Sequence, residues 1–255
     1  MLVDKITLKD IGLFDTDESE GIVSHLNFCK TNGGKEQLDQ YLAHPLNTIE
    51  AIEKRQNAIA IFISEIDFIN EMKITNGTAL VTEKFFGTAF KTIPTQISYP
   101  GAFWYQYINA SDYALIKYSL DHLMLFYENL NKWLLVFENK NQNPIIANLV
   151  QNIKKLVQHP ALTNIHTQTS LTNPQKLLSL AYFFRNHYKN NTLQLLQYFY
   201  ELDAYYSMAT AAKKFNFVFP TWLNSETPQL EVIAAIHPLV PNPIDNTISL
   251  SSQTN

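Results

Sequence analysis

The strongest pattern in the sequence is a run of apolar side chains between residues 113 and 137. They recur at alternating spacings of three and four, and they are Tyr113, Ile116, Leu120, Leu123, Tyr127, Leu130, Leu134 and Phe137. Such spacing is the a/d pattern of a helix that buries one seam. It predicts a long helix over 111–139, of about 40 Å at ~1.5 Å per residue. Leu115, Phe126 and Trp133 widen the stripe, so we expect both flanks of this helix to be buried as well.

Shorter stretches with helical spacing fill most of the remaining chain. Thr16 or Asp17 can cap the first of them, and Asn47 with Glu50 forms a variant of the capping box at the start of another. Asn76-Gly77 is expected to break a helical stretch. The predicted helices cover 17–30, a short segment through Leu38 that follows a break at 31–34 and stops before Pro45, then 48–63, 65–90 in two parts, 144–159, 174–191 and 192–214.

The helical pattern is lost in two places. Between residues 90 and 110, prolines and a glycine punctuate the aromatic stretch Tyr99–Tyr107, which we interpret as an irregular connection packed on the helical body. Near the C-terminus, the segments 217–220, 230–233 and 247–250 are separated by turn residues and predict short strands.

Together these elements predict an all-α fold. We expect an elongated helical bundle with two long, lever-like helices near 111–139 and 192–215, which form an antiparallel pair and set the length of the molecule. A small C-terminal β appendage follows. The expected domains are residues 1–215, the helical body, and residues 216–255, the short β segment.

Composition restricts the class of protein further. Apolar residues make up 46% of the 255 residues and charged residues 16%, which excludes wholesale disorder. The formal net charge of −4 is not that of a free-standing nucleic-acid binder. The single cysteine, Cys29, has no partner for an internal disulfide and favours a reducing compartment. Because no signal peptide and no apolar run of ~20 residues occurs, we expect a cytoplasmic protein that does not contact a membrane.

Sequence motifs for catalysis and metal binding are missing. The chain contains no HExxH, GxSxG, CxxC, GxGxxG or GxxxxGK[ST] pattern. Asp15 and Asp17 only faintly resemble a calcium loop, and the histidines lack further ligands at metal spacing. Gly33-Gly34-Lys35 fits a capped helix start better than a phosphate cradle. We therefore expect no catalytic residue, metal site or cofactor site in this chain.

Asp203 is an acidic residue of interest because it lies beside the apolar stripe of Phe199, Leu202 and Tyr206. It is either a buried acid at a moving interface or a structural acid that bonds a neighbour such as a tyrosine hydroxyl. We favour the structural interpretation and keep the other open.

Two segments carry more information than their periodicity. The first contains FCKTNGGKEQL at 28–38, YLAHPL at 41–46, and Ile49, Ile52, Arg55 and Gln56. The second is ELDAYYSMA at 201–209, followed by Phe219-Pro220 and by His237-Pro238-Leu239. The first resembles the opening of the core domain in the MutS family of DNA mismatch repair proteins. The second is similar to that family's Leu-Asp-x-x-x-Ser-x-Ala lever-helix motif.

This resemblance implies a helical core and lever domain that relays nucleotide state between an ATPase domain and DNA. It places Asp203 and Ser207 at the coupling interface, and His237 and Pro238 near the start of the ATPase domain, shortly before its P-loop. It also implies that the intact protein binds ATP, Mg²⁺ and DNA and forms a homodimer. We expect this chain to be a fragment that lacks the ATPase domain and has no enzyme activity. We expect it to lack the mismatch-reading domain too, so mismatch specificity is not implied.

Two other functions remain open from the residues alone. The lysine pairs Lys154-Lys155 and Lys213-Lys214 can contact phosphates, so direct DNA binding is a second hypothesis, which the net charge disfavours. The third is a helical protein-interaction scaffold without a DNA or nucleotide role, in which the 113–137 seam meets a partner helix or its own copy. Packing of that seam inside the bundle is the simpler explanation.

Overall fold

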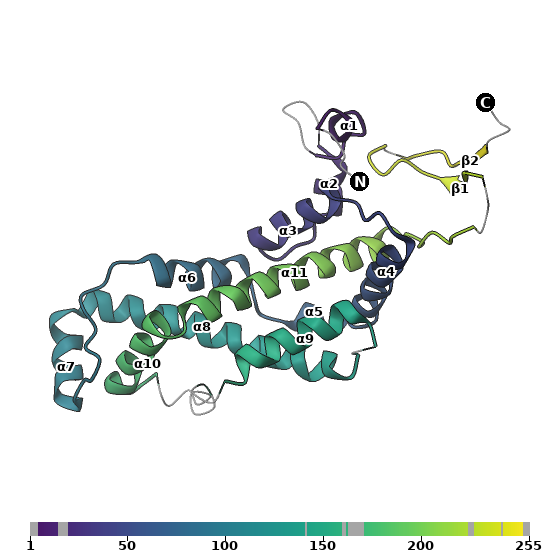
Figure 1. The fold of residues 1–255 in the computed structure, drawn as a ribbon. Helices are drawn as coiled ribbons and strands as arrows, with labels where there is room; N and C mark the ends of the chain where they lie inside the picture. Colours follow the sequence, from purple (N-terminus) through teal and green to yellow (C-terminus); the bar gives the residue numbers. More distant parts are fainter. Residues whose placement is uncertain are drawn as a thin grey trace.

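The computed structural model describes residues 5–14, 20–140, 142–159, 162, 171–223, 227–240 and 242–251. Figure 1 shows an elongated, mostly helical molecule with α7 at one end and a small β hairpin at the other. The elements are α1 (Lys5–Asp10), α2 (Ile22–Leu26), α3 (Asn32–Ala43), α4 (Ile49–Ser64), α5 (Ile66–Glu71), α6 (Asn76–Gly87), α7 (Tyr99–Ile108), α8 (Ala110–Phe137), the 3₁₀ turn η1 (Glu138–Lys140), α9 (Pro144–Val157), α10 (Pro174–Asn186), α11 (Lys189–Lys214), β1 (Gln229–Ala235) and β2 (Asn246–Ser251). The all-α prediction with a small β appendage is confirmed.

Helix α8 is the long helix that the heptad spacing predicts. All eight seam residues are buried, and so are Phe126 and Trp133 on the flanks. Leu115 is 45% exposed, so the expectation that both flanks are buried is wrong at that position. The seam packs inside the helical body against α6 and α9. Because the seam is already buried inside the body, it is not free to bind a partner helix. This excludes the form of the scaffold hypothesis in which the seam is the interface.

The two long helices α8 and α11 run in the same direction, and the prediction of an antiparallel pair is wrong. Tyr127 in the middle of α8 bonds Thr192 at the start of α11, with 2.9 Å between their hydroxyl oxygens. Further along both helices, Phe62 of α4 packs against Phe137 of α8 and Tyr205 of α11. The reason is topological: α9 and α10 lie between the two helices in sequence and return the chain to the α7 end before α11 begins (Figure 1).

Threonine and serine caps decide where several helices begin. Thr31, Thr48, Thr75 and Ser98 each precede a helix in extended backbone, and each side chain accepts the backbone N–H three residues later. The cap of α4 is therefore Thr48 and not Asn47. The predicted capping box is wrong in its second half too, because Glu50 pairs with Lys54 at 2.5 Å.

Two boundary predictions fail at threonine caps, and a third fails at the junction of α10 and α11. Residues 31–34 and Asn76-Gly77 begin α3 and α6 instead of interrupting the chain, because a threonine cap precedes each. The break between α5 and α6 lies at residues 72–75. Helix α10 ends at Asn186, earlier than expected, and α11 begins at Lys189.

Helix α7 replaces the irregular connection that we predicted over the aromatic stretch. Ser98 caps it, and Pro100 lies in its first turn, where the missing N–H has no intrahelical partner to lose. Ala102 and Tyr105 are buried against the body, but Trp104 is 66% and Tyr107 81% exposed. The expectation that this stretch packs on the body is thus correct for only one face.

The C-terminal strands form one antiparallel hairpin, in which Leu230 pairs with Leu250 and Val232 with Ile248. Residues 217–220, predicted as a strand, are not in one. Among the described residues from 213 to 251, none is buried. In Figure 1 the hairpin lies apart from helices α3 to α11. A hairpin of two strands has little stability of its own in water.

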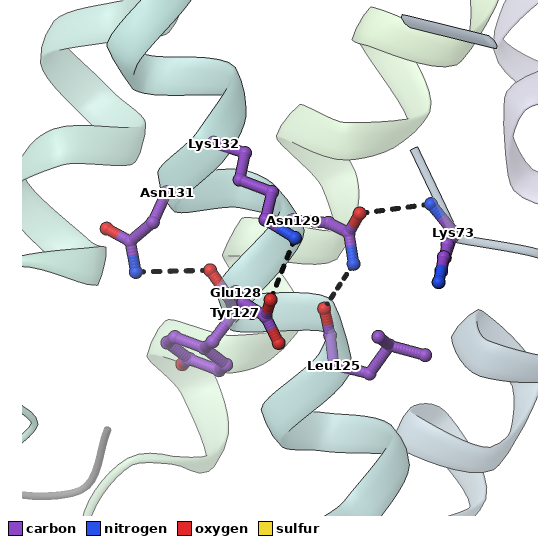
Figure 2. Close-up of polar contacts among 7 residues, drawn as sticks. All are labelled: Lys73, Leu125, Tyr127, Glu128, Asn129, Asn131 and Lys132. Atoms are coloured by element: carbon purple, nitrogen blue, oxygen red, sulfur yellow. Dashed lines mark hydrogen bonds and ion pairs between the residues drawn. The ribbon is translucent and has the colours of Figure 1, made fainter. Parts of the chain in front are cut away.

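A buried asparagine fixes the break between α5 and α6. Asn129 of α8 is 2% exposed, and its carbonyl oxygen accepts the Lys73 backbone N–H at 3.0 Å. Its amide nitrogen donates to the Leu125 carbonyl at 2.8 Å (Figure 2). Asn131, two residues later, donates to the Tyr127 carbonyl within the same helix. Of these two side chains, only that of Asn129 connects α8 to another segment.

We expect Asn129→Ala to lower the free energy of unfolding by about 1–3 kcal/mol, because it leaves the Lys73 N–H without its partner. Asn131→Ala is the matched control, with an expected change within about 0.5 kcal/mol. Urea denaturation of the three chains measures both values. Equal losses in the two variants contradict the role given to Asn129.

Candidate coupling site on helix α11

Asp203 and Ser207 lie one turn apart on the same face of α11. Both are buried, with exposed fractions of 3% and 0%. A buried carboxylate and a buried hydroxyl are costly unless their hydrogen bonds are satisfied. Their partners all come from the segment 26–31, more than 170 residues away in sequence.

Asp203 binds the start of α3. Its Oδ1 accepts the Lys30 backbone N–H at 2.8 Å, and its Oδ2 accepts the Thr31 backbone N–H at 2.8 Å. The Thr31 hydroxyl donates to the same Oδ2 at 2.6 Å and accepts the Gly34 N–H at 3.0 Å. The side chain that caps α3 is thus itself held by Asp203. The partner expected from the sequence, a tyrosine hydroxyl, is replaced by a threonine hydroxyl and two backbone amides.

Ser207 holds the preceding residues in the same way. Its hydroxyl accepts the Phe28 backbone N–H at 2.8 Å and donates to the Leu26 carbonyl at 2.9 Å. These bonds need extended backbone after Leu26, so in the described residues 20–30 the helix predicted over 17–30 is limited to α2. Its predicted caps, Thr16 and Asp17, lie outside the described residues. We call the contact of residues 26–31 with Asp203 and Ser207 the clasp.

Two glycines allow α3 to approach α11 at the clasp. A Cβ added to Gly34 would lie 2.1 Å from the Asp203 carboxylate, and one added to Gly33 would lie 2.4 Å from the Tyr200 ring. Neither distance is possible for a real side chain. These positions therefore require glycine for space and not for backbone conformation.

Lys30 extends the clasp to the end of α5. Its ammonium donates to the Ile69 carbonyl at 2.6 Å and lies 4.9 Å from the centre of the Tyr206 ring. A cation at the last carbonyls of a helix is favoured by the helix dipole. Burial lowers the pKa of Lys30, and the charge of Asp203 opposes that shift.

The clasp has the electrostatics of a structural contact. Burial raises the pKa of Asp203, while the bonds from Thr31 and Lys30 act in the opposite direction. Burial, and then the negative charge of Asp203, raise the pKa of Cys29 to about 12. A thiol with that pKa stays protonated at neutral pH and is a poor nucleophile. This set of groups is suited to holding two segments together and not to chemistry.

A second contact joins α3, α4 and α11 beside the clasp. The Arg55 guanidinium lies 4.5 Å from the centre of the Tyr41 ring, and the Tyr41 ring lies 5.7 Å from that of Tyr205. The Tyr41 hydroxyl donates to Glu201 at 3.5 Å. Burial raises the pKa of Glu201, and the bond from Tyr41 opposes that shift.

His237 and Pro238 are not part of this site. They lie in the connection between β1 and β2, where His237 is exposed and its Nδ1 accepts the Leu239 N–H at 3.3 Å. No described contact brings either residue to the clasp. In the part of the chain that the structure describes, no group of three metal-ligating side chains occurs, and no helix is both long and apolar enough to span a membrane.

The motif segments that lie far apart in sequence thus meet on one face of α11. The family model of MutS domain III matches residues 6–209, a range that contains every residue of the clasp. The chain belongs to the MutS domain III family. No match to a curated protein was found. MutS domain III is a non-catalytic core domain of MutS proteins, which agrees with the expectation that these residues carry no catalysis.

Sequence reasoning selected two of the residues that meet in this contact. It singled out Asp203 and Ser207 but missed that their partners are the backbone of residues 26–31 and the Thr31 hydroxyl. The Thr31-x-x-Gly34 spacing was a signal for the cap of α3. Nothing in the spacing indicates that Asp203 holds this cap, because that contact depends on how α3 packs against α11.

We expect Gly34→Ala to lower the free energy of unfolding by about 2 kcal/mol, because the new methyl group overlaps the Asp203 carboxylate. Gly77→Ala in the first turn of α6 is the matched control. Its nearest neighbour would lie at 3.6 Å, so the usual gain of up to about 1 kcal/mol for replacing a helical glycine is expected.

Thermal or urea denaturation of both variants gives the comparison. The comparison depends on the opposite signs of the two changes in the free energy of unfolding. A general effect of alanine at helix starts changes the stability of both variants in the same direction. Stabilisation of the Gly34→Ala chain contradicts the close approach of α3 to α11.

Proposed function

We propose that this chain is the core and lever module of a MutS-related, DNA-handling ATPase. In this role it couples nucleotide state in an ATPase domain to DNA binding or to the conformation of a dimer. The clasp is the observation that carries the proposal. It makes the N-terminal segment, α3 and α11 move as one body, which is what a mechanical coupling element requires.

The position of the clasp on α11 supports this role. It lies in the last three turns of α11, at the end from which the chain continues to the β hairpin (Figure 1). Phe215, directly after α11, stacks on His25 of α2 at 4.5 Å, and Lys214 lies 4.8 Å from the Phe28 ring. A displacement that reaches the end of α11 is therefore passed to α2 through these ring contacts and to α3 through the clasp.

The proposed partners follow from membership of the MutS family. We propose that the intact protein binds ATP and Mg²⁺ outside the present residues, acts on DNA, forms a homodimer and works in the cytoplasm. His237 and Pro238 are proposed to lie near the start of the nucleotide-binding part. Direct DNA binding by the lysine pairs is not favoured, because Lys154 pairs with Glu138 at 2.9 Å and Lys214 lies over Phe28.

The reading frame of the native gene provides the first test. We expect it to continue past Asn255 and to contain a GxxxxGK[ST] motif within the next domain length. A stop codon after Asn255, or a following domain that does not bind ATP, contradicts the proposal. The clasp is then only a structural contact.

We propose that residues 216–255 form a unit separate from the helical body. A chain that ends at Val218 keeps the bond from the Phe217 N–H to the Ala212 carbonyl at the end of α11. Because the described residues after 213 are not buried, this truncation is expected to change the free energy of unfolding by less than about 0.5 kcal/mol. Urea denaturation checks this, and a loss of several kcal/mol contradicts the proposed boundary.

The coupling role predicts that Asp203→Asn separates the two activities of the intact protein. The amide of asparagine replaces one acceptor by a donor, so at least one of the Lys30 and Thr31 bonds is lost. We expect ATP hydrolysis to remain, while ATP no longer changes DNA affinity; couplings of this kind are typically ~5–150-fold. Fluorescence anisotropy of labelled duplexes and junctions with and without ATP measures the effect.

The control for general destabilisation is Asn129→Ala, which weakens the body without touching the clasp. That variant is expected to keep the ATP-dependent change in affinity. If both variants lose it, or if Asp203→Asn retains it, the clasp does not couple the two sites.

A further inference from the structure

Helix α7 lies at the end of the molecule opposite the C-terminal end of α11 (Figure 1), and it exposes a wide apolar face. The exposed fractions are 50% for Tyr99, 47% for Phe103, 66% for Trp104, 81% for Tyr107 and 58% for Ile108. Their rings lie close together, with centroids 4.9 Å apart for Tyr99 and Phe103 and 6.4 Å apart for Trp104 and Tyr107. Exposed apolar groups that form a continuous patch usually mark a binding surface.

The charge pattern around α7 restricts what this surface binds. No Lys, Arg, Asp or Glu occurs from Thr92 to Ser111. Nucleic-acid binding needs cations for the phosphates, and attraction to anionic lipid needs a basic face, so neither fits this segment. Aromatic enrichment with depletion of charge is instead the composition of the core of a protein–protein interface.

A groove lies directly beside the exposed aromatic residues. It has a volume of about 350 Å³ and is bordered by Pro94, Ile97, Gly101, Trp104 and Ile108. Helix α7 and the residues directly before it thus carry both a ridge of ring side chains and a hollow lined largely by apolar groups. A surface with both shapes meets the requirement for a twofold contact, in which each copy inserts its ridge into the groove of the other.

We propose that α7 is a self-association surface and that its partner is a second copy of this chain. At about 200 Å² for a whole aromatic side chain, the exposed parts of the four rings amount to roughly 500 Å² per copy. Complete burial of these rings in both copies removes about 1,000 Å² from water, which is the lower limit for a specific interface. An interface of this size is typical of a reversible contact, so we expect a dimer in exchange with monomer. It does not depend on the coupling role proposed above.

Sedimentation velocity of the 255-residue chain, from about 1 to 200 µM, tests the proposal. We expect the weight-average mass to rise from monomer towards dimer over this range. The double variant Trp104→Gln with Tyr107→Gln is expected to stay monomeric. Both side chains are largely exposed, so the variant is expected to fold, which circular dichroism verifies.

Two further variants separate this surface from other exposed apolar residues. Leu135→Gln on α8 and Ile233→Gln on β1 replace side chains that are 73% and 74% exposed away from α7. Both are expected to dimerise like the parent chain. If the parent chain is monomeric throughout, or if the α7 double variant still dimerises, the proposal is overturned. The same holds if Ile233→Gln alone abolishes the dimer, because the hairpin is then the interface.

Cross-linking gives a direct view of the contact. In a Cys29→Ser background, Tyr107→Cys is expected to form a covalent dimer with a short bis-maleimide, and Leu135→Cys is not. Equal cross-linking of both positions indicates random collision and contradicts the proposal. The proposal is also overturned if the chain stays monomeric but binds neutral vesicles or single-stranded DNA, and if Trp104→Gln with Tyr107→Gln abolishes that binding. The surface then belongs to another partner.

Discussion

The carboxylate of Asp203 is the group on which the arrangement of this domain depends. It takes up the backbone amides of Lys30 and Thr31 and the hydroxyl that caps α3. Removal of this acceptor leaves three donors without their partner, two of them buried, and unsatisfied buried donors are costly. This contact determines how the chain on either side of Thr31 lies against α11. Extended backbone precedes Thr31, a helix follows it, and glycine is needed where that helix touches α11.

Much of the fold could be predicted because burial follows helical spacing. The seam of α8 is the best example, since its eight residues are all buried. The errors occur where a local side-chain bond overrides a general preference. Asn76-Gly77 has the composition of a turn, yet Thr75 makes it a helix start, and Ser98 does the same for the aromatic stretch of α7. The direction of α11 relative to α8 was beyond reach, because it depends on the path of α9 and α10.

In the candidate site too, some features could be predicted from the sequence and others could not. Asp203 and Ser207 could be selected because their spacing matches a known lever motif, and because an acid beside an apolar stripe is unusual. Their partners could not, because a backbone amide leaves no trace in the sequence. Both segments lie within the range that the family model of MutS domain III matches. The two ends of the molecule then differ in character: polar bonds to backbone hold one together, and uncharged aromatic side chains cover the other.

The position of Cys29 gives this domain a built-in reporter. Its sulfur lies 3.7 Å from the Asp203 carbonyl, inside the clasp, and burial together with the charge of Asp203 raises its pKa to about 12, so the docked thiol is protonated at pH 7. Alkylating reagents attack the thiolate, so the docked segment is nearly inert towards them. Whenever residues 26–31 leave α11, the same thiol regains the reactivity of an ordinary cysteine. The rate at which a maleimide modifies the native protein is therefore a measure of how often the N-terminal segment detaches, obtained without any engineered label.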